Sequence, residues 1–486
     1  MNRLRTGYVF LALSGLVAVA CSSSTDNASK SSPTTNQNNV DPGASSSGNV
    51  ELDGSSNVID PPDSSTGGPV GTGTVTDPPP DEKCGAGEPK LCGLKAKCAA
   101  DADCESGLCG KVGASTGMCI SAPSCTGGAG ADFTCGPAGN EDCCHTIPVP
   151  GGKFTNYNWD SSKPEGSQFR PSDAEVSAFA LDEFEVTVGR LRAFFSAKQG
   201  NLRDGHPKAG DGAHPLIAGT GWRDSWNVRL PSSFQEINDR MIQACSEGGD
   251  NANWGATTWT ADPGANESKP ANCIDWYTLY AFCAWDGGRM PTDLEWSYVA
   301  LGGDQELTYP YGNDKPTFES HKDILVTSFV ANQDASYGVY TEGPTYRGQA
   351  DGPLHISVVG KKLERSKWGH ADLGGNVIEF VMEVPKDVPT TCHDCAINLS
   401  YPDPPQNEPG PPPTWKTKNP DGTELPGDDF AEAKAVKDGK RLARGGSWMG
   451  EYEGHWLETN KARHWYPVWR TYSALGVRCA RDIKKP

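Results

Sequence analysis

The sequence predicts an α+β domain, in which strand patterns and helix patterns both occur, preceded by a small disulfide-rich module. Ten of the 17 cysteines lie between Cys84 and Cys144, in a segment with too few apolar residues to form a core without covalent bonds. Residues 179–187 alternate apolar and polar side chains, as a half-buried strand does. Residues 276–283 instead repeat apolar side chains at helical spacing. Strand and helix patterns therefore both follow the cysteine-rich segment.

Residues 1–20 have the features of a lipoprotein signal peptide. Arg3 and Arg5 precede an apolar run that is too short for a comfortable membrane span. Residues 18–21, A-V-A-C, resemble a bacterial lipobox, in which Cys21 would carry the lipid. Ser22 directly after it favours the outer membrane, so we expect a lipid-anchored protein of the cell envelope, on its periplasmic or surface face. The alternative is ordinary secretion with a free Cys21.

Residues 21–83 read as a flexible tether. They consist mainly of Ser, Thr, Asn, Pro, Gly and Asp, with almost no large apolar side chains. Such a segment buries too little surface to offset its chain entropy. We expect it to hold the folded part of the protein away from the membrane.

Residues 84–145 form the predicted disulfide-rich module. Without Cys21 the chain keeps an even number of cysteines, which an oxidising compartment favours. A zinc site is the competing interpretation, but the spacings are not paired C-x-x-C knuckles, so disulfides are favoured. Ten cysteines allow too many pairings for the sequence to assign them.

Residues 146–484 are expected to form one large domain, because no linker divides them. Two insertions are expected, at about 201–268 and about 384–437, and the second is rich in proline. The formal net charge of −19 argues against a nucleic-acid partner, whose phosphates require a basic surface.

The expected elements of this domain follow in order. A first strand spans 147–154, and the strand at 179–187 ends at Thr187, which is a good N-cap for a helix over 188–195. A helix with Trp276, Leu279, Tyr280 and Cys283 on its apolar positions ends at Gly287-Gly288. Thr292 and Glu295 then form a capping box at the start of another helix.

Five landmarks in this order resemble the formylglycine-generating-enzyme, or sulfatase-modifying-factor, family. They are residues 147–154, residues 179–195, residues 272–303 with the R-M-P-T-D-L-E-W run at 289–296, the D-L-G-G-N-V-I-E-F run at 372–380, and the R-G-G-S-W run at 444–448 with the segment 474–480 after it. The resemblance implies the fold of that family, which is irregular, mixed in α and β, and similar to C-type lectin-like domains.

The resemblance also implies a structural calcium site. Asn376, the Val377 carbonyl and Glu379 would be its oxygen ligands, and Asn332 resembles the start of the family's other calcium site. The alternative is that Asn376 and Glu379 hydrogen-bond the amides of a turn.

The family's oxidase binds copper(I) through two cysteines, one directly after the G-G-S-aromatic-M run and one five residues later. Here Gly450 and His455 stand at those places, so copper and standard formylglycine chemistry are not expected. The remaining candidates in the cleft that the resemblance implies are Ser447, Trp448, Glu451, His455 and Arg463. Glu451, Glu453, His455 and His464 could hold a harder metal, but a solvated acidic loop with incidental histidines is favoured.

Apart from Cys21, six cysteines lie outside the module. The resemblance implies a bridge between Cys283 and Cys479, while Cys245 and Cys273 flank the first insertion and could pin it. Cys392 and Cys395 could form a local disulfide, a redox-active dithiol or a metal site, of which a structural staple in the loop is favoured.

Three functions are compatible with these features. The first is a repurposed binding or scaffold protein for an exported protein, peptide or glycan. The second is an aberrant formylglycine-generating oxidase or another oxidative tailoring enzyme. The third is a purely structural envelope protein without a ligand, and the sequence leaves open whether any catalysis remains.

Overall fold

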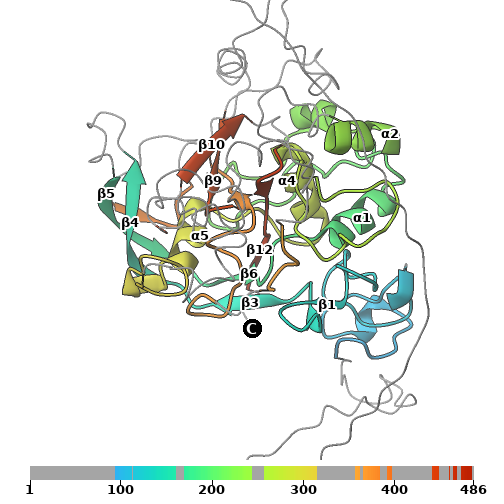
Figure 1. Ribbon diagram of the computed structural model, residues 1–486, viewed down its shortest axis with the longest axis horizontal. Helices are drawn as coiled ribbons and strands as arrows, with labels where there is room; N and C mark the ends of the chain where they lie inside the picture. Colours follow the sequence, from blue (N-terminus) through green and yellow to red (C-terminus); the bar gives the residue numbers. More distant parts are fainter. Residues whose placement is uncertain are drawn as a thin grey trace, which may run out of the picture. The chain divides into compact units, whose positions relative to one another are not determined.

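The computed structural model describes residues 93–111, 113–159, 169–243, 257–314, 356–361, 365–383, 391–396, 440–447, 459, 463–467 and 472–483 (Figure 1). All of them belong to one compact unit that spans residues 78–486. No helix within these ranges is both long enough and apolar enough to cross a membrane.

A three-stranded sheet joins the two ends of the large domain. Strand β6 (Phe179–Asp182) lies between β3 (Thr146–Val149) and β12 (Ala480–Asp482), and both outer strands are antiparallel to it. The predicted first strand over 147–154 is in fact two strands. Pro150 and Gly151 separate β3 from β4, because proline has no backbone N–H with which to continue a ladder.

Two further sheets complete the β-structure of this domain. Strand β4 (Gly152–Trp159) pairs antiparallel with β5 (Phe169–Val176), which pairs in parallel with β8 (Thr391–His393). The other sheet has the order β10-β9-β7-β11, with the strands Arg463–Pro467, Lys440–Arg444, Ile378–Phe380 and Leu475–Gly476. A small ladder of β1 (Phe133–Cys135) and β2 (Glu141–Asp142) precedes them.

The described α-helices are short, and each begins at a side-chain cap. Thr187 caps α1 (Val188–Ala197), Ser233 caps α2 (Phe234–Asn238) and Asp275 caps α4 (Trp276–Trp285). The capping box predicted for α5 (Asp293–Ala300) is present. Glu295 N–H donates to Thr292 Oγ1 at 3.1 Å, and Thr292 N–H donates to Glu295 Oε2 at 2.8 Å. Helix α5 contacts β4, β5 and β9 (Figure 1).

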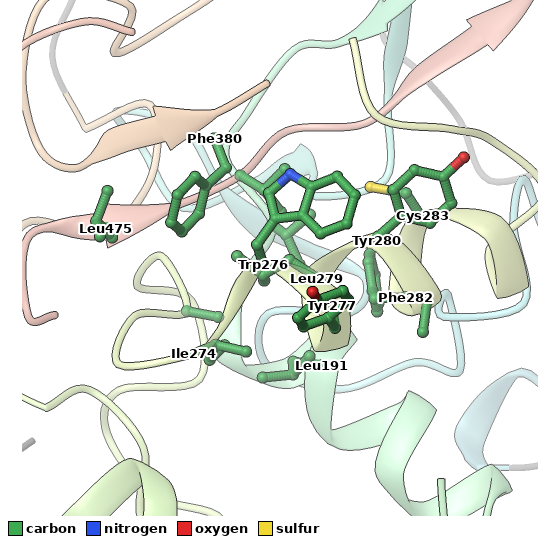
Figure 2. Close-up of a cluster of buried hydrophobic side chains, with 14 of the residues drawn as sticks. Leu191, Ile274, Trp276, Tyr277, Leu279, Tyr280, Phe282, Cys283, Phe380 and Leu475 are labelled. Carbon is green, nitrogen blue, oxygen red and sulfur yellow. The ribbon is translucent and has the colours of Figure 1, made fainter. Parts of the chain in front are cut away.

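An aromatic core lies around α4. Figure 2 shows the indole of Trp276 beside the ring of Phe380, with Tyr280 and Cys283 further along the helix. The first insertion supplies part of this core, since Trp222 and Trp226 are buried in it and the Trp226 ring lies 5.3 Å from that of Trp276. The insertion is therefore packed into the domain rather than laid over its surface.

The disulfide prediction for the module is confirmed for the cysteines within the described ranges. The bridges are Cys98–Cys109, Cys104–Cys119, Cys125–Cys144 and Cys135–Cys143. Cys84 and Cys92 lie outside those ranges. Cys98, Cys104 and Cys119 lie close enough to hold a metal, but all three are oxidised to disulfides and offer no thiolate.

The end of the module is built into the core of the large domain through Arg190. This fully buried side chain forms ion pairs with Asp182 at 2.9 Å and with Asp286 at 2.6 Å. It also donates to Ser124 Oγ at 3.0 Å, while Ser124 N–H donates to Asp286 Oδ1 at 2.8 Å. Residues before and after 146 therefore share one hydrogen-bond network.

Candidate functional site

The arginine–carboxylate cluster consists of Asp293, Glu383, Arg444 and Arg463. Asp293 is the first residue of α5 and lies between two guanidinium groups, with Arg444 Nε 3.1 Å from its Oδ1 and Arg463 Nη2 2.9 Å from its Oδ2. Its backbone N–H donates to Glu383 Oε2 at 2.9 Å. The cluster joins a helix to the facing ends of strands β9 and β10.

The local backbone explains how Arg444 reaches the cluster. Arg444 ends β9, and Gly445 after it has a φ of 84°, which only glycine adopts without strain. A Cβ at this glycine would lie 2.9 Å from the Leu373 carbonyl oxygen. The turn therefore requires Gly445, and it directs Ser447 into a buried position.

Burial controls the protonation of this cluster. It raises the pKa of Glu383 well above its usual range, and the nearby charge of Asp293 raises it further. It lowers the pKa of Arg444 to about 9, and the charge of Arg463 adds to this effect. Among the described residues, Glu383 Oε1 and Arg444 Nη1 have no hydrogen-bond partner. Burial and the charge of Asp293 therefore both favour the protonated form of Glu383.

Of the predicted cleft candidates, Ser447 and Arg463 are described. Besides its ion pair, Arg463 donates to Asn156 Oδ1 at 3.1 Å. Trp448, Glu451 and His455 lie outside the described ranges, as does Gly450. Asp293, Glu383 and Arg444 were not singled out as functional from the sequence, although Asp293 and Arg444 lie within two of the family runs.

The prediction that His464 lies in a solvated acidic loop is wrong. It lies buried on β10, and its Nε2 is 3.1 Å from the Gly445 carbonyl oxygen. Burial lowers its pKa to about 3, so the ring is neutral at physiological pH. The histidine thus stabilises the turn at Gly445.

The predicted calcium ligands take part in a second buried network. Arg478 donates to Glu379 Oε1 at 2.6 Å and to Oε2 at 2.7 Å, and Trp296 Nε1 donates to Oε2 at 2.8 Å. Asn376 Oδ1 accepts from Ser357 N–H at 3.1 Å, and its Nδ2 donates to Glu185 Oε2 at 2.7 Å.

These contacts decide how well the residues fit a calcium ion. Both oxygens of Glu379 accept from Arg478, so a calcium ion bound there would share the carboxylate with a guanidinium group, whose positive charge disfavours the cation. In the described conformation Asn376 and Glu379 therefore do not fit the ion as a ready ligand set. Asn332 lies outside the described ranges, and calcium stays a prediction from the resemblance.

The disulfides outside the module agree with the sequence where they are described. Cys283 on α4 is bonded to Cys479, and Cys392 is bonded to Cys395. Cys273 is disulfide-bonded, whereas its predicted partner Cys245 lies outside the described ranges.

Fold and site together define a mixed α+β domain in which irregular sheets and short helices surround buried arginine–carboxylate contacts. The chain belongs to the family of the sulfatase-modifying factor enzyme 1-like domain, whose profile matches residues 134–483. The match begins inside the predicted disulfide-rich module, in agreement with the hydrogen bonds that join the end of the module to the core.

The chain is similar to proteins named as formylglycine-generating enzymes and to proteins named as inactive ones. A formylglycine-generating enzyme from Bos taurus is 23% identical over 238 residues, which cover 46% of this chain and 57% of that protein. An inactive C-alpha-formylglycine-generating enzyme 2 from Mus musculus is 43% identical over 248 residues, which cover 48% of this chain and 67% of that protein. The chain thus spans little more than half of the bovine enzyme. Among solved structures, PvdO from Pseudomonas aeruginosa matches at 16% identity with a TM-score of 0.36, covering 70% of this chain and 94% of that one.

Proposed function

We propose that this chain is a lipid-anchored protein of the cell envelope, in the outer membrane, whose sulfatase-modifying-factor-like domain binds an exported protein, peptide or glycan without formylglycine chemistry. The observation that carries the proposal is the pair Gly450 and His455, at the two positions where the resemblance requires copper-binding cysteines. Glycine offers no ligand atom, and one imidazole does not replace two thiolates.

Two other observations support a binding role. The similar proteins include one named as inactive, so the family's scaffold also occurs without the activity. Within the part of the chain that the structure describes, Asp293, Arg444 and Arg463 are engaged with one another, which suits a rigid support for a variable segment. The alternative function is a formylglycine-generating oxidase or related oxidative tailoring enzyme acting on exported proteins. Similarity to proteins of that name favours it.

A peptide assay separates the two functions. The purified protein is incubated with copper(I), oxygen and a Cys-x-Pro-x-Arg peptide, and the peptide mass is followed beside an active formylglycine-generating enzyme. We expect the peptide to stay unchanged with this chain. Aldehyde formation that is lost in His455→Ala would overturn the binding proposal and support the oxidase.

A gain-of-ligand variant provides the matched control. Gly450→Cys combined with His455→Cys should bind copper(I) in competition with a chromophoric chelator, because two thiolates suit this soft ion. The unaltered chain should leave copper(I) bound to the chelator. Equal copper binding by both proteins would show that other residues supply a copper site.

The lipid anchor has its own test. Cells that produce the chain are fed radiolabelled palmitate, and we expect the label on the protein and its loss in Cys21→Ser. Fractionation should place the labelled protein in the outer membrane. An unlabelled chain released into the medium would instead support ordinary secretion.

A further inference from the structure

The disulfide between Cys392 and Cys395 closes very little chain. Its two cysteines are separated by 3 positions, against 8 for Cys135–Cys143 and 196 for Cys283–Cys479. The loop entropy that a cross-link removes from the unfolded chain grows with loop length. This bridge therefore stabilises the fold less through loop closure than the other two.

The two cysteines of this bridge differ in how far they are buried. Cys392 is 4% exposed and belongs to the core beside β5, whereas Cys395 packs against the same core and is only partly buried. Cys135 and Cys143, by comparison, are 0% and 1% exposed. Cys395 is thus the more accessible residue of the short bridge, and Cys392 is the buried one.

Hydrogen bonds that do not involve sulfur hold the segment 391–394 in place. Strand β8 with Cys392 pairs in parallel with β5, and Asp394 N–H donates to the Glu175 carbonyl at 2.9 Å. The Asp394 carboxylate accepts from Ser177 N–H and from Ser177 Oγ–H, both at 2.6 Å. These contacts do not depend on the sulfur–sulfur bond and remain available when it opens.

The reduced state has a hydrogen-bond partner already in place. Cys395 Sγ lies 3.6 Å from the His393 carbonyl oxygen, an acceptor that only a thiol can use. The imidazole of His393 is 61% exposed and lies 3.3 Å from Asp394. Residues 392–395 thus provide a hydrogen-bond acceptor for the reduced Cys395 thiol. Their other hydrogen bonds position Cys392 in the disulfide.

From this arrangement we infer that Cys392 and Cys395 are a thiol–disulfide exchange pair that acts on a peptide disulfide. In the reduced pair the accessible Cys395 thiolate attacks one sulfur of the peptide disulfide, forming a mixed disulfide and releasing the first peptide thiolate. The Cys392 thiol, on losing its proton, attacks Cys395 Sγ and releases the second thiolate. The peptide gains two electrons and two protons, the pair becomes the disulfide seen in the structure, and an external dithiol reduces it again.

The first test measures which disulfides open in the folded protein. The protein is equilibrated in glutathione buffers of increasing reducing strength, free thiols are alkylated, and labelled cysteines are identified by mass spectrometry. We expect Cys392 and Cys395 to be labelled while Cys135, Cys143 and the Cys283–Cys479 bridge stay protected. Opening of all these bridges together, or of this one only on unfolding, would overturn the proposal.

The second test traps the intermediate. After mild reduction, Cys392→Ser should accumulate a mixed disulfide with a dye-labelled peptide disulfide at Cys395, because it lacks the resolving thiol. Cys395→Ser should form at least about tenfold less adduct, since its remaining thiol is buried. Equal trapping by both variants, or by neither, would contradict the mechanism. The proposal does not rest on the binding function, because these assays follow sulfur exchange and leave residues 450 and 455 unchanged.

Discussion

At the scale of single residues, buried arginines connect segments that are distant in the sequence. Arg478, near the end of the chain, forms a two-pronged ion pair with Glu379 and donates to the carbonyls of Glu183 and Ala371 at 2.9 and 2.7 Å. A guanidinium group suits this role because its donors form a fixed planar fork. One side chain thus joins three separate stretches of chain.

Removal of Glu379 should therefore destabilise the protein strongly. We expect Glu379→Ala to lower the free energy of unfolding by about 3–5 kcal/mol, because it leaves the Arg478 charge buried and unpaired. Urea denaturation followed by tryptophan fluorescence measures the change. Asp304→Ala is the control, since Asp304 pairs with Lys367 at the surface and its loss should cost less than about 1 kcal/mol. Similar midpoints for both variants would contradict this role for Glu379.

His464 should make the protein less stable in acid. Its pKa is lowered from 6.5 to about 3 on folding, so between these values the unfolded chain binds a proton that the folded chain does not. The unfolding free energy should thus fall as pH decreases from 6.5, and His464→Gln should remove about 1.4 kcal/mol per pH unit from that slope. Denaturation midpoints between pH 4 and 7 test this difference. Parallel profiles would show that His464 titrates in the folded protein.

At the scale of secondary-structure elements, α1 contacts two different parts of the chain through two arginines. Arg190 reaches the end of the disulfide-rich module, through Ser124 and the Cys143 carbonyl. Arg192 forms an ion pair with Glu267 at 2.8 Å and donates to the Thr260 carbonyl at 2.9 Å. A short helix thereby fixes both the module and the end of the first insertion.

Exchanging each arginine for methionine should separate these two contacts. Arg190→Met should speed amide hydrogen exchange in 122–145, because Ser124 and Asp286 lose a buried partner. Arg192→Met should instead speed exchange in 257–268 and leave 122–145 protected. Mass spectrometry of exchanged peptides provides the readout. A uniform increase in both variants would indicate that the arginines support the whole fold rather than separate segments.

The sequence predicted those helix starts that depend on hydrogen bonds between residues close together in the chain. Thr187 and the Thr292–Glu295 box set the starts of α1 and α5 through hydrogen bonds within a single turn. The burial of Trp222 and Trp226 could not be predicted, because it depends on packing against α4 rather than on neighbours in the sequence. The sequence indicated only an insertion at about 201–268.

The candidate site was predicted less completely, for the same physical reason. Ser447 and Arg463 came from the family resemblance, whereas Glu383 carries no local signal of its role. Its raised pKa arises from burial and from Asp293, a residue 90 positions away in the sequence. Such a group is recognised only when the fold brings the two carboxyls together.

At the scale of the whole molecule, the Cys283–Cys479 bridge closes a large part of the domain. Both cysteines are fully buried, and their separation is 196 residues. Replacing both by alanine should lower the unfolding free energy by about 5 kcal/mol, as expected for so long a loop. The same change at Cys392 and Cys395 should cost clearly less. Thermal unfolding of the two variants compares them, and an equal loss would contradict the loop-length argument.

The sheet of β3, β6 and β12 also sets the mechanical response of the domain. Both outer strands run in the same direction, so Thr146, opposite Asp182, and Asp482, opposite Phe179, lie toward opposite ends of β6. A pull on the chain at these two residues runs along the strands, and all hydrogen bonds of both ladders share the load instead of breaking one at a time. The covalent Cys283–Cys479 bond also prevents the chain between its cysteines from extending. The domain should consequently behave as a stiff, shear-loaded element when its two ends are pulled apart.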